Sequence, residues 1–335
     1  MLQRLAELLQ KKAVVLMYHR IAEPDTDPWQ LSVSPSNFEA QLKVLRATRK
    51  VIPVQALAEQ LAKKKIAAGS ICITFDDAYT DNYIHAKPLL EKYQCAATLF
   101  PATRFLDRPQ PFWWDELEAI LLRAPSLPEH FEQVFFGSAV NVHLEEDSSL
   151  TPAAWQQHRQ WVWTEPPPTR RCALYLTLWE HLRPLPFNEI EAAMQGIRSW
   201  AGTAPAAPVP DCPMTSDQIR EFISNPLFDL GLHTHTHADL GAHPAAVQEA
   251  EISGSAAFLQ THFMHRARTI AFPYGRYNSN TLSLVRALSL TAAFTTSGKF
   301  VTRLTDPHQI PRFQVCNWNS ESFAWHLRRW RRGVL

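Results

Sequence analysis

Two adjacent carboxylates, Asp76 and Asp77, directly follow the apolar run Ile71–Phe75 of this 335-residue chain. Neighbouring residues on a strand point to opposite faces, but where a strand ends the chain turns, and both carboxylates can then reach one cavity. One of them could hold a metal ion while the other stays free to act as a base. The pair could equally cap a following helix, so by itself it leaves both interpretations open.

Three histidines, His233, His235 and His237, alternate with threonine after a second apolar run, Phe228–Leu232. On a strand the three imidazoles would share one face, whereas on a helical turn the first and last would align and the middle one would point away. Both geometries bring His233 and His237 together. Two neutral imidazoles and one carboxylate form a zinc-type catalytic set with a position left open for water.

Two further apolar runs also end on residues that could take part in chemistry. Ala13–Tyr18 leads into His19, and Thr269–Phe272 leads into Pro273 and Tyr274. In barrels of parallel strands, functional residues gather at the carboxyl ends of the strands. Four such endings in one chain therefore predict one shared site.

The segments that must position these residues alternate between strand and helix patterns. Strands are expected at Ala13–Tyr18, Ile71–Phe75, Ala96–Phe100, Phe228–Leu232, Thr269–Phe272 and Ala292–Thr295. Helices are expected at Ser36–Thr48 (capped by Ser36), Val54–Lys65, Tyr83–Tyr93, Ala245–Thr261 and Thr281–Leu288. This alternation predicts an α/β fold with a parallel sheet, in the form of a barrel.

The alternation is lost between about Arg104 and Thr215, a stretch that contains PFWWDELEAILL, three consecutive prolines and an Ala/Pro-rich segment. We interpret residues 104–214 as a mostly helical, Pro-rich insertion. Residues 1–103 and 215–335 then form two parts of one barrel, the second ending in a basic helix. Trp113 and Trp114 in the insertion could stack on sugar rings or could simply be buried where a helix begins.

Composition and charge narrow the class of protein. With 46% apolar and 19% charged residues the chain can bury a large core, and a net charge of +1 gives no overall field that selects nucleic acid. The five cysteines are odd in number and form no C-x-x-C pair, which argues against a disulfide framework and a zinc ribbon.

We find no signal-peptide pattern and no run of 18 apolar residues, so we expect a cytoplasmic protein. The basic C-terminal segment FAWHLRRWRRGVL could contact an anionic membrane surface peripherally or dock as a final helix.

The segments ITFDDAYTDNY, HTHTHADL and AFPYGRYN resemble the successive motifs of the polysaccharide deacetylase (NodB-homology) family, carbohydrate esterase family four. The resemblance covers roughly residues 13–103 and 215–318 and implies the distorted (β/α) barrel of that family. It implies that Asp76 is the general base. It also implies a divalent metal, most often zinc with cobalt or nickel as substitutes, on Asp77, His233 and His237.

The third of these motifs implies further site residues. The backbone N–H of Tyr274 would help to bind the oxyanion, and Pro273 beside it would line the substrate site. Two departures from the family pattern stand out: Ala78 occupies the place of the usual glycine, and Ala271 and Phe272 stand where an arginine usually precedes the proline.

The segment VVLMYHRI near the N-terminus is similar to the branch of the family that includes poly-N-acetylglucosamine deacetylases, in which the barrel is circularly permuted. This similarity implies that His19 is the acid that protonates the departing amine. We expect it to reach the cavity from the side opposite Asp76. Arg268 resembles the arginine of an R-x4-P variant of that branch and would contact the substrate.

The resemblance implies metal-dependent hydrolysis of the N-acetyl group of an amino sugar in a glycan or glycan precursor, with release of acetate. The expected partner is an N-acetylated sugar or glycan. One alternative is a catalytically inactive carbohydrate-binding module on the same barrel, which the intact motif residues argue against. Another is a non-haem iron oxygenase with two histidines and a carboxylate, but there the carboxylate usually lies close to the first histidine, and Asp77 lies far upstream of His233.

Overall fold

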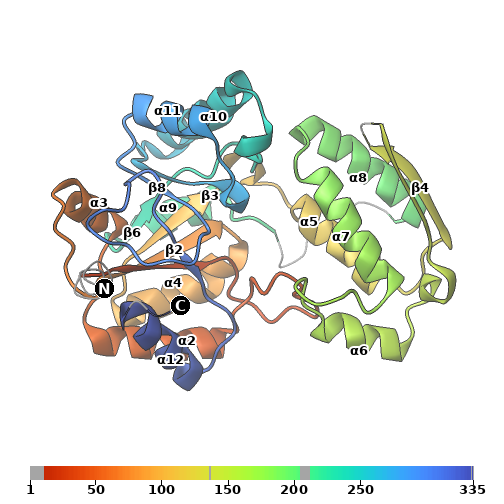
Figure 1. Cartoon of the computed structure of the whole chain (residues 1–335), viewed down its shortest axis with the longest axis horizontal. Helices are drawn as coiled ribbons and strands as arrows, with labels where there is room; N and C mark the ends of the chain where they lie inside the picture. Colours follow the sequence, from red (N-terminus) through yellow and green to blue (C-terminus); the bar gives the residue numbers. More distant parts are fainter. Residues whose placement is uncertain (1–10, 136, 204–211, 333, 335) are drawn as a thin grey trace, which may run out of the picture. The chain divides into compact units, whose positions relative to one another are not determined.

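The computed structural model describes residues 11–135, 137–203, 212–332 and 334, which divide into two compact units (Figure 1). The first unit comprises the described residues of Met1–Glu23, Leu31–Asp107 and Met214–Leu335. The second comprises Pro24–Gln30 and the described residues of Arg108–Pro213. The predicted boundaries at 104 and 214 differ from these by a few residues, and no sequence pattern predicted that Pro24–Gln30 belongs to the second unit.

A ring of parallel strands forms the centre of the first unit. Its five-stranded sheet has the order β6-β3-β2-β1-β9, and parallel bridges at Leu232–Ile270 and Phe294–Ile310 join it to the pair β7-β8. The strands are β1 (Val14–Tyr18), β2 (Ile71–Asp77), β3 (Ala97–Pro101), β6 (Phe228–Leu230), β7 (Thr269–Ala271), β8 (Ala292–Phe294) and β9 (Phe313–Gln314). The predicted distorted α/β barrel is confirmed, and β9 is a strand that the sequence did not predict.

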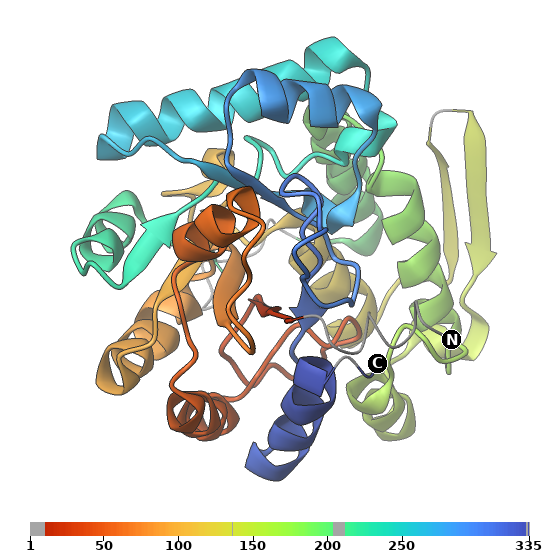
Figure 2. The same cartoon turned by 60° about the vertical axis from the view of Figure 1, so that its left-hand side comes forward.

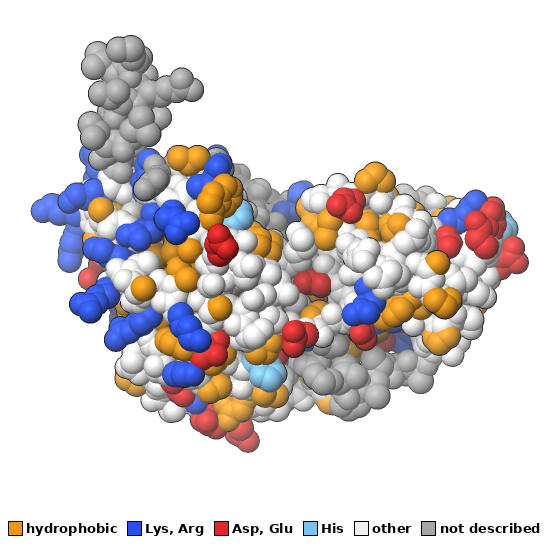
Figure 3. Space-filling view, turned by 90° about the horizontal axis from the view of Figure 1, so that it is seen from below, with side chains coloured by type: hydrophobic (Ala, Val, Ile, Leu, Met, Phe, Trp, Pro, Cys, Tyr) orange, Lys and Arg blue, Asp and Glu red, His pale blue; other side chains and the backbone are white. Residues whose placement is uncertain are grey.

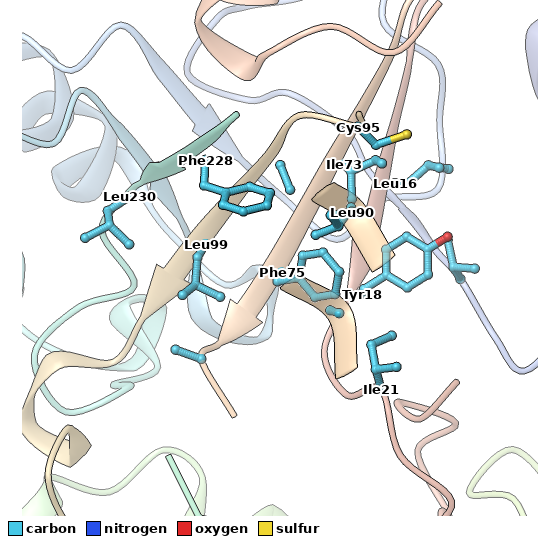
Figure 4. Close-up of a cluster of buried hydrophobic side chains, with 14 of the residues drawn as sticks. Leu16, Tyr18, Ile21, Ile73, Phe75, Leu90, Cys95, Leu99, Phe228 and Leu230 are labelled. Carbon is cyan, nitrogen blue, oxygen red and sulfur yellow. The ribbon is translucent and has the colours of Figure 1, made fainter. Parts of the chain in front are cut away.

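Alternate residues of the strands face the helices that surround the ring. Leu16 and Tyr18 of β1 and Ile73 and Phe75 of β2 pack in one buried cluster with residues of those helices (Figure 4). Burying an apolar side chain of this size stabilises the fold by about 1.5–3 kcal/mol. Because successive strand residues point to opposite faces, this packing directs the next residue, Asp76, to the inside of the ring.

Seven α-helices of the described residues belong to this unit, with α10 and α11 on one side of the sheet and α2, α4 and α12 on another (Figures 1 and 2). Their bounds are α2 (Pro35–Thr48), α3 (Val54–Ala62), α4 (Lys87–Tyr93), α9 (Ser216–Ile223), α10 (Ala245–Phe263), α11 (Ser279–Ala287) and α12 (Ser320–Arg332). Two details differ from the sequence prediction. Ser34, not Ser36, caps α2 by accepting the N–H of Asn37 at 3.2 Å. A π-helical turn, Asn82–Ala86, precedes α4, whose second residue Pro88 has no N–H to continue a regular helix.

The second unit combines helices with an antiparallel hairpin. Its helices are α5 (Trp113–Glu118), α6 (Pro152–Gln160), α7 (Arg170–Leu182) and α8 (Phe187–Ala201), and its strands are β4 (His130–Phe135) and β5 (Ser138–His143). The hairpin was not predicted, since only Phe131 and Phe135 of β4 are buried and the apolar alternation is weak. Trp29 joins Pro24–Gln30 to this unit through ring contacts with Trp163 and Trp179.

One sequence expectation, the Ala/Pro-rich segment before Pro213, lies mostly outside the described residues. Within the residues that the structure describes, we find no helix with both the length and the apolar character needed to cross a membrane.

Candidate active site

The two aspartates at the end of β2 reach one cavity because the backbone turns there. Asp77 and Ala78 have positive φ angles of 68° and 62°. This left-handed turn rotates the carboxylate of Asp77 away from the face that strand alternation would give it. A left-handed residue with a Cβ costs roughly 1–2 kcal/mol, which is the physical reason why a glycine is the easier residue at the position of Ala78.

Asp77, His233 and His237 are all buried, and each offers a ligand atom within 4.8 Å of the others. The Nε2 atoms of His233 and His237 lie 3.5 and 3.2 Å from Asp77 Oδ1. Among the described residues no hydrogen-bond donor satisfies Asp77 Oδ1. A buried carboxylate oxygen without a donor, beside two imidazole nitrogens, fits a cation held by the three side chains.

The imidazoles of His233 and His237 differ in their hydrogen bonding and in the direction of their pKa shifts. His233 Nδ1 donates to the carbonyl of Ala271 in β7 at 2.8 Å, which leaves the lone pair of Nε2 facing Asp77. Burial opposes protonation of His233, but the nearby Asp76 outweighs it, and its pKa is raised. Burial lowers the pKa of His237 to about 3, so this imidazole is neutral, as a metal ligand must be.

The histidine loop is neither a strand nor a helical turn, the two geometries considered from the sequence. Thr234 and His237 adopt left-handed φ angles of 62° and 60°. Glu251 of α10 accepts the backbone N–H groups of His235 and Thr236 at 2.9 and 2.8 Å, which fixes the loop. The ring of His235 is turned to Thr103, with its Nδ1 3.0 Å from the hydroxyl oxygen. The loop therefore brings the first and last histidines together and separates the middle one.

Asp76 has a different partner, which sequence reasoning missed. Arg312, fully buried just before β9, donates to both carboxylate oxygens of Asp76 at 2.7 Å. It also donates to the hydroxyl of Thr74 and the carbonyl of Thr295. Burial opposes ionisation of Asp76, but the guanidinium charge outweighs it and holds the pKa of Asp76 well below its usual value. The only sequence signal was an arginine between apolar residues in IPRF at 310–313.

His19 follows β1 and lies beside Asp76, with its Nε2 3.9 Å from Asp76 Oδ2. The expectation that it would approach from the side opposite Asp76 is wrong, and the strand register gives the reason. Tyr18 pairs with Phe75, so the next residues of the two strands, His19 and Asp76, are neighbours as well.

The backbone around His19 is anchored by the segment after β2. Asn82 Nδ2 donates to the carbonyl of His19 at 2.9 Å. Asp81 accepts the backbone N–H of Ile21 at 2.8 Å and the Nε of Arg20 at 3.0 Å. Burial lowers the pKa of His19, so its imidazole is held mainly neutral.

Tyr274 and Pro273 follow β7 and reach the same place. The Tyr274 ring meets the His237 ring edge-on, with centroids 4.6 Å apart. Its backbone is left-handed, with φ 56°, and Pro273 before it is buried. The residues at the ends of β1, β2, β6 and β7 are thus gathered at the carboxyl edge of the ring, with Arg312 beneath them.

Of the predicted substrate contacts, Arg268 is not brought to this cluster, and Trp113 and Trp114 belong to the second unit. Arg268 is exposed and precedes β7, so it lies at the opposite end of that strand from Pro273. Trp113 and Trp114 are only 7% exposed and pack in the second unit, where Trp114 stacks on Phe112. Sugar stacking needs an open ring face, so the structure favours the other interpretation, tryptophans buried where a helix begins.

A closed ring of parallel strands with an Asp-His-His cluster and a separate ionised carboxylate at its carboxyl edge defines a hydrolase type of site. The family model for polysaccharide deacetylases matches residues 63–128 and 180–293, together more than half of the chain. The chain belongs to the polysaccharide deacetylase family.

Two named relatives match part of the chain. YxkH of Bacillus subtilis strain 168, a protein named after the same family, is 31% identical over 36% of this chain. A poly-beta-1,6-N-acetyl-D-glucosamine N-deacetylase of Staphylococcus aureus strain MRSA252 is 24% identical over 35% of it. The matched segments span 42% of the length of each relative.

Two solved structures share the fold over nearly the whole chain. IcaB from Ammonifex degensii has a TM-score of 0.58 at 17% identity and covers 96% of this chain and 98% of its own. The Streptococcus pyogenes deacetylase PplD in complex with acetate has a TM-score of 0.57 at 18% identity, covering 95% and 99%. At this identity the likeness establishes the fold.

Proposed function

We propose that the protein hydrolyses the N-acetyl group of an amino sugar in a glycan or glycan precursor and releases acetate, with the help of a divalent metal. The observation that carries the proposal is the separation of two adjacent carboxylates. Asp77 faces the two imidazoles, whereas Asp76 is held by Arg312 as an ionised group of its own. The name of the Staphylococcus aureus relative, an N-deacetylase of a polymer of N-acetylglucosamine, supports this class of substrate.

Asp77, His233 and His237 would hold the metal, most often zinc, with cobalt or nickel as substitutes. When bound, such a metal supplies a Lewis acid that lowers the pKa of water and polarises a carbonyl. The neutral imidazole of His237 and the hydrogen bond of His233 Nδ1 to the backbone prepare these ligands for it.

Asp76 would accept the proton of the attacking water. Its two hydrogen bonds to Arg312 keep it ionised and fix the direction of its remaining lone pairs. The backbone N–H of Tyr274 would donate to the oxyanion that forms on the acetyl carbon, in the manner of an oxyanion hole. The left-handed backbone at Tyr274, next to His237, supports this assignment.

His19 would take up the water proton from Asp76 and give it to the sugar nitrogen as the carbon–nitrogen bond breaks, because an amine is a poor leaving group until it is protonated. The products are acetate and a free amino sugar. The base and the acid lie side by side, 3.9 Å apart, which supports a proton passing from the side of the water to that of the amine. The cytoplasmic location stays a prediction.

The decisive experiment measures metal content and acetate release together, with N-acetylglucosamine oligomers as substrate and zinc added. We expect His237→Ala to lose both, because two protein ligands hold a catalytic metal poorly. His235→Ala is the matched control: its ring is turned to Thr103, so it keeps its metal and its activity. Full metal occupancy in His237→Ala would refute the ligand assignment, and a zinc-loaded native protein that releases no acetate would refute the function.

A further inference from the structure

Positively charged side chains converge at the amino ends of β1 and β2, the end of the ring opposite to the candidate active site. The carbonyl of Lys50, after α2, accepts the N–H of Ile71 at 2.9 Å. The N–H of Gly69, in the loop after α3, donates to the carbonyl of Lys12 at 2.7 Å. The guanidinium of Arg331 in α12 lies directly against Gly69. These contacts bring the ends of three helices together.

We call this cluster the basic face. It consists of Arg46, Arg49, Lys50, Lys63, Lys64, Lys65, Arg328 and Arg331, all exposed except the half-buried Arg331. Figure 3 shows lysine and arginine side chains crowded over this end of the first unit, with few acidic groups among them. Since the whole chain has a net charge of only +1, the charge is concentrated here rather than general.

Most of these cations have no acidic partner. Within the described residues only Lys63 has a carboxylate in range, Glu59 at 3.9 Å, and none pairs with the other exposed members of the basic face. The helix macrodipole favours a cation in the last turn of a helix, but Lys50, Lys64 and Lys65 lie beyond the ends of α2 and α3. Crowded like charges repel one another, so this arrangement fits a surface that meets a negatively charged partner.

Helix α12 adds an aromatic group to the cluster. Phe323, Leu327 and Trp330 pack into the core, which fixes the helix on the barrel. On its other side Trp325 is 47% exposed, and the guanidinium of Arg329 lies 4.5 Å from the centre of its ring. An exposed tryptophan beside arginines is the combination that anchors proteins at the level of lipid headgroups.

We propose that the basic face binds the surface of an anionic phospholipid bilayer, with Trp325 at the headgroups. Each basic residue near such a surface contributes about 1 kcal/mol, so several unpaired cations give stable peripheral binding. Bound in this way, the protein presents the carboxyl edge of the ring, and with it the candidate active site, away from the bilayer. The inference concerns the opposite end of the barrel and does not depend on the proposed function.

Co-sedimentation of the full chain with lipid vesicles tests the proposal. The native protein should sediment with vesicles that contain phosphatidylglycerol and not with pure phosphatidylcholine vesicles, and added salt should release it. Lys64→Gln/Arg328→Gln should weaken binding about 30-fold, at roughly fivefold for each charge removed. The matched control, Arg159→Gln/Lys299→Gln, removes two exposed cations outside the basic face and should bind within about twofold of the native protein.

Two further measurements distinguish binding to a bilayer from the proposed catalytic function and from binding to nucleic acid. Acetate release from a soluble oligosaccharide should be equal in the native protein and in Lys64→Gln/Arg328→Gln, so a failure of the proposed function leaves the vesicle result intact. A single-stranded oligonucleotide serves as a competing anion. Equal loss of vesicle binding in both double variants, binding to neutral vesicles, or tighter binding to the oligonucleotide would each overturn the proposal.

Discussion

The two units bury carboxylates in opposite ways. In the barrel, Asp76 accepts two hydrogen bonds from Arg312 at 2.7 Å, and its carboxylate stays ionised. In the second unit, the described partners of Glu118 are the hydroxyl of Thr26 at 2.5 Å and the guanidinium of Arg123 at 4.0 Å. Burial there raises the pKa of Glu118 to about 8.

Asp76 therefore stays ionised and can take part in catalysis, whereas Glu118 is a buried carboxyl that can hold a proton. A buried ionised group is costly unless a partner of opposite charge lies beside it, and the barrel provides that partner, Arg312, from the segment just before β9. The second unit leaves Glu118 to take up a proton, and satisfies its buried Arg171 with backbone carbonyls, among them those of Ala124 and Ser148. Four substitutions test this contrast.

The largest effect should come from Asp76→Asn. The amide cannot accept the proton of water, so turnover should fall by about 10²–10⁴, the usual contribution of a positioned general base. Metal content should stay unchanged, because Asp76 is not among the three clustered ligands. Acetate release and metal analysis of the same preparation check both points. Near-normal turnover would mean that another group activates the water.

The next largest effect should come from Arg312→Met, which should lower the stability of the fold. It leaves Asp76 buried without its partner, and the free energy of unfolding should fall by about 3–5 kcal/mol, as for other broken buried pairs. Urea unfolding gives the measurement. Asp76→Asn/Arg312→Met is the control, since removing both charges should recover part of the loss. A single variant as stable as the native protein would show that the pair is not needed to hold the barrel.

His19→Ala should lower turnover by about 10²-fold, the lower end of the range for acid–base groups. The loss should appear mainly with acetamide substrates. An activated aryl acetate has a leaving group that needs no proton, so its hydrolysis should suffer far less. The ratio of the two rates in native protein and variant is the readout. Equal losses on both substrates would leave His19 a structural residue at the mouth of the barrel.

Glu118→Gln should leave turnover unchanged and should appear only in the pH dependence of stability. In the unfolded chain this carboxyl loses its proton near pH 4.5, and in the folded protein near pH 8. Between these values the folded state binds more protons, so rising pH destabilises it, by at most about 1.4 kcal/mol per pH unit. Asp27 and Asp115 raise the pKa of Glu118 further, and Arg123 opposes them.

Thermal unfolding between pH 4.5 and pH 8 compares the two proteins, and the variant should lose this component of the slope. Identical slopes would show that Glu118 is ionised in the folded state.

The sequence could predict the residues at the strand ends because buried strands with regular alternation leave a clear apolar pattern. It could not predict Arg312, since β9 spans only Phe313 and Gln314 and leaves no pattern. It misjudged the side of His19, because the register of β1 on β2 is set by packing across the sheet. It also left the geometry of the histidine loop open, since the left-handed residues Thr234 and His237 are neither glycine nor asparagine.

The ends of the second unit's main segment meet within the barrel. The N–H of Asp107 donates to the carbonyl of Met214 at 3.3 Å, and the carboxylate of Asp107 accepts the N–H of Ser216 at 2.7 Å. In terms of protein engineering, residues 108–213 form a cassette that a short linker could replace without moving a strand of the ring. Such a trimmed enzyme would leave Pro24–Gln30 without its partners in the second unit. Trp29, for example, donates its Nε1 N–H to Tyr175 at 2.6 Å, so a polar residue would have to take its place.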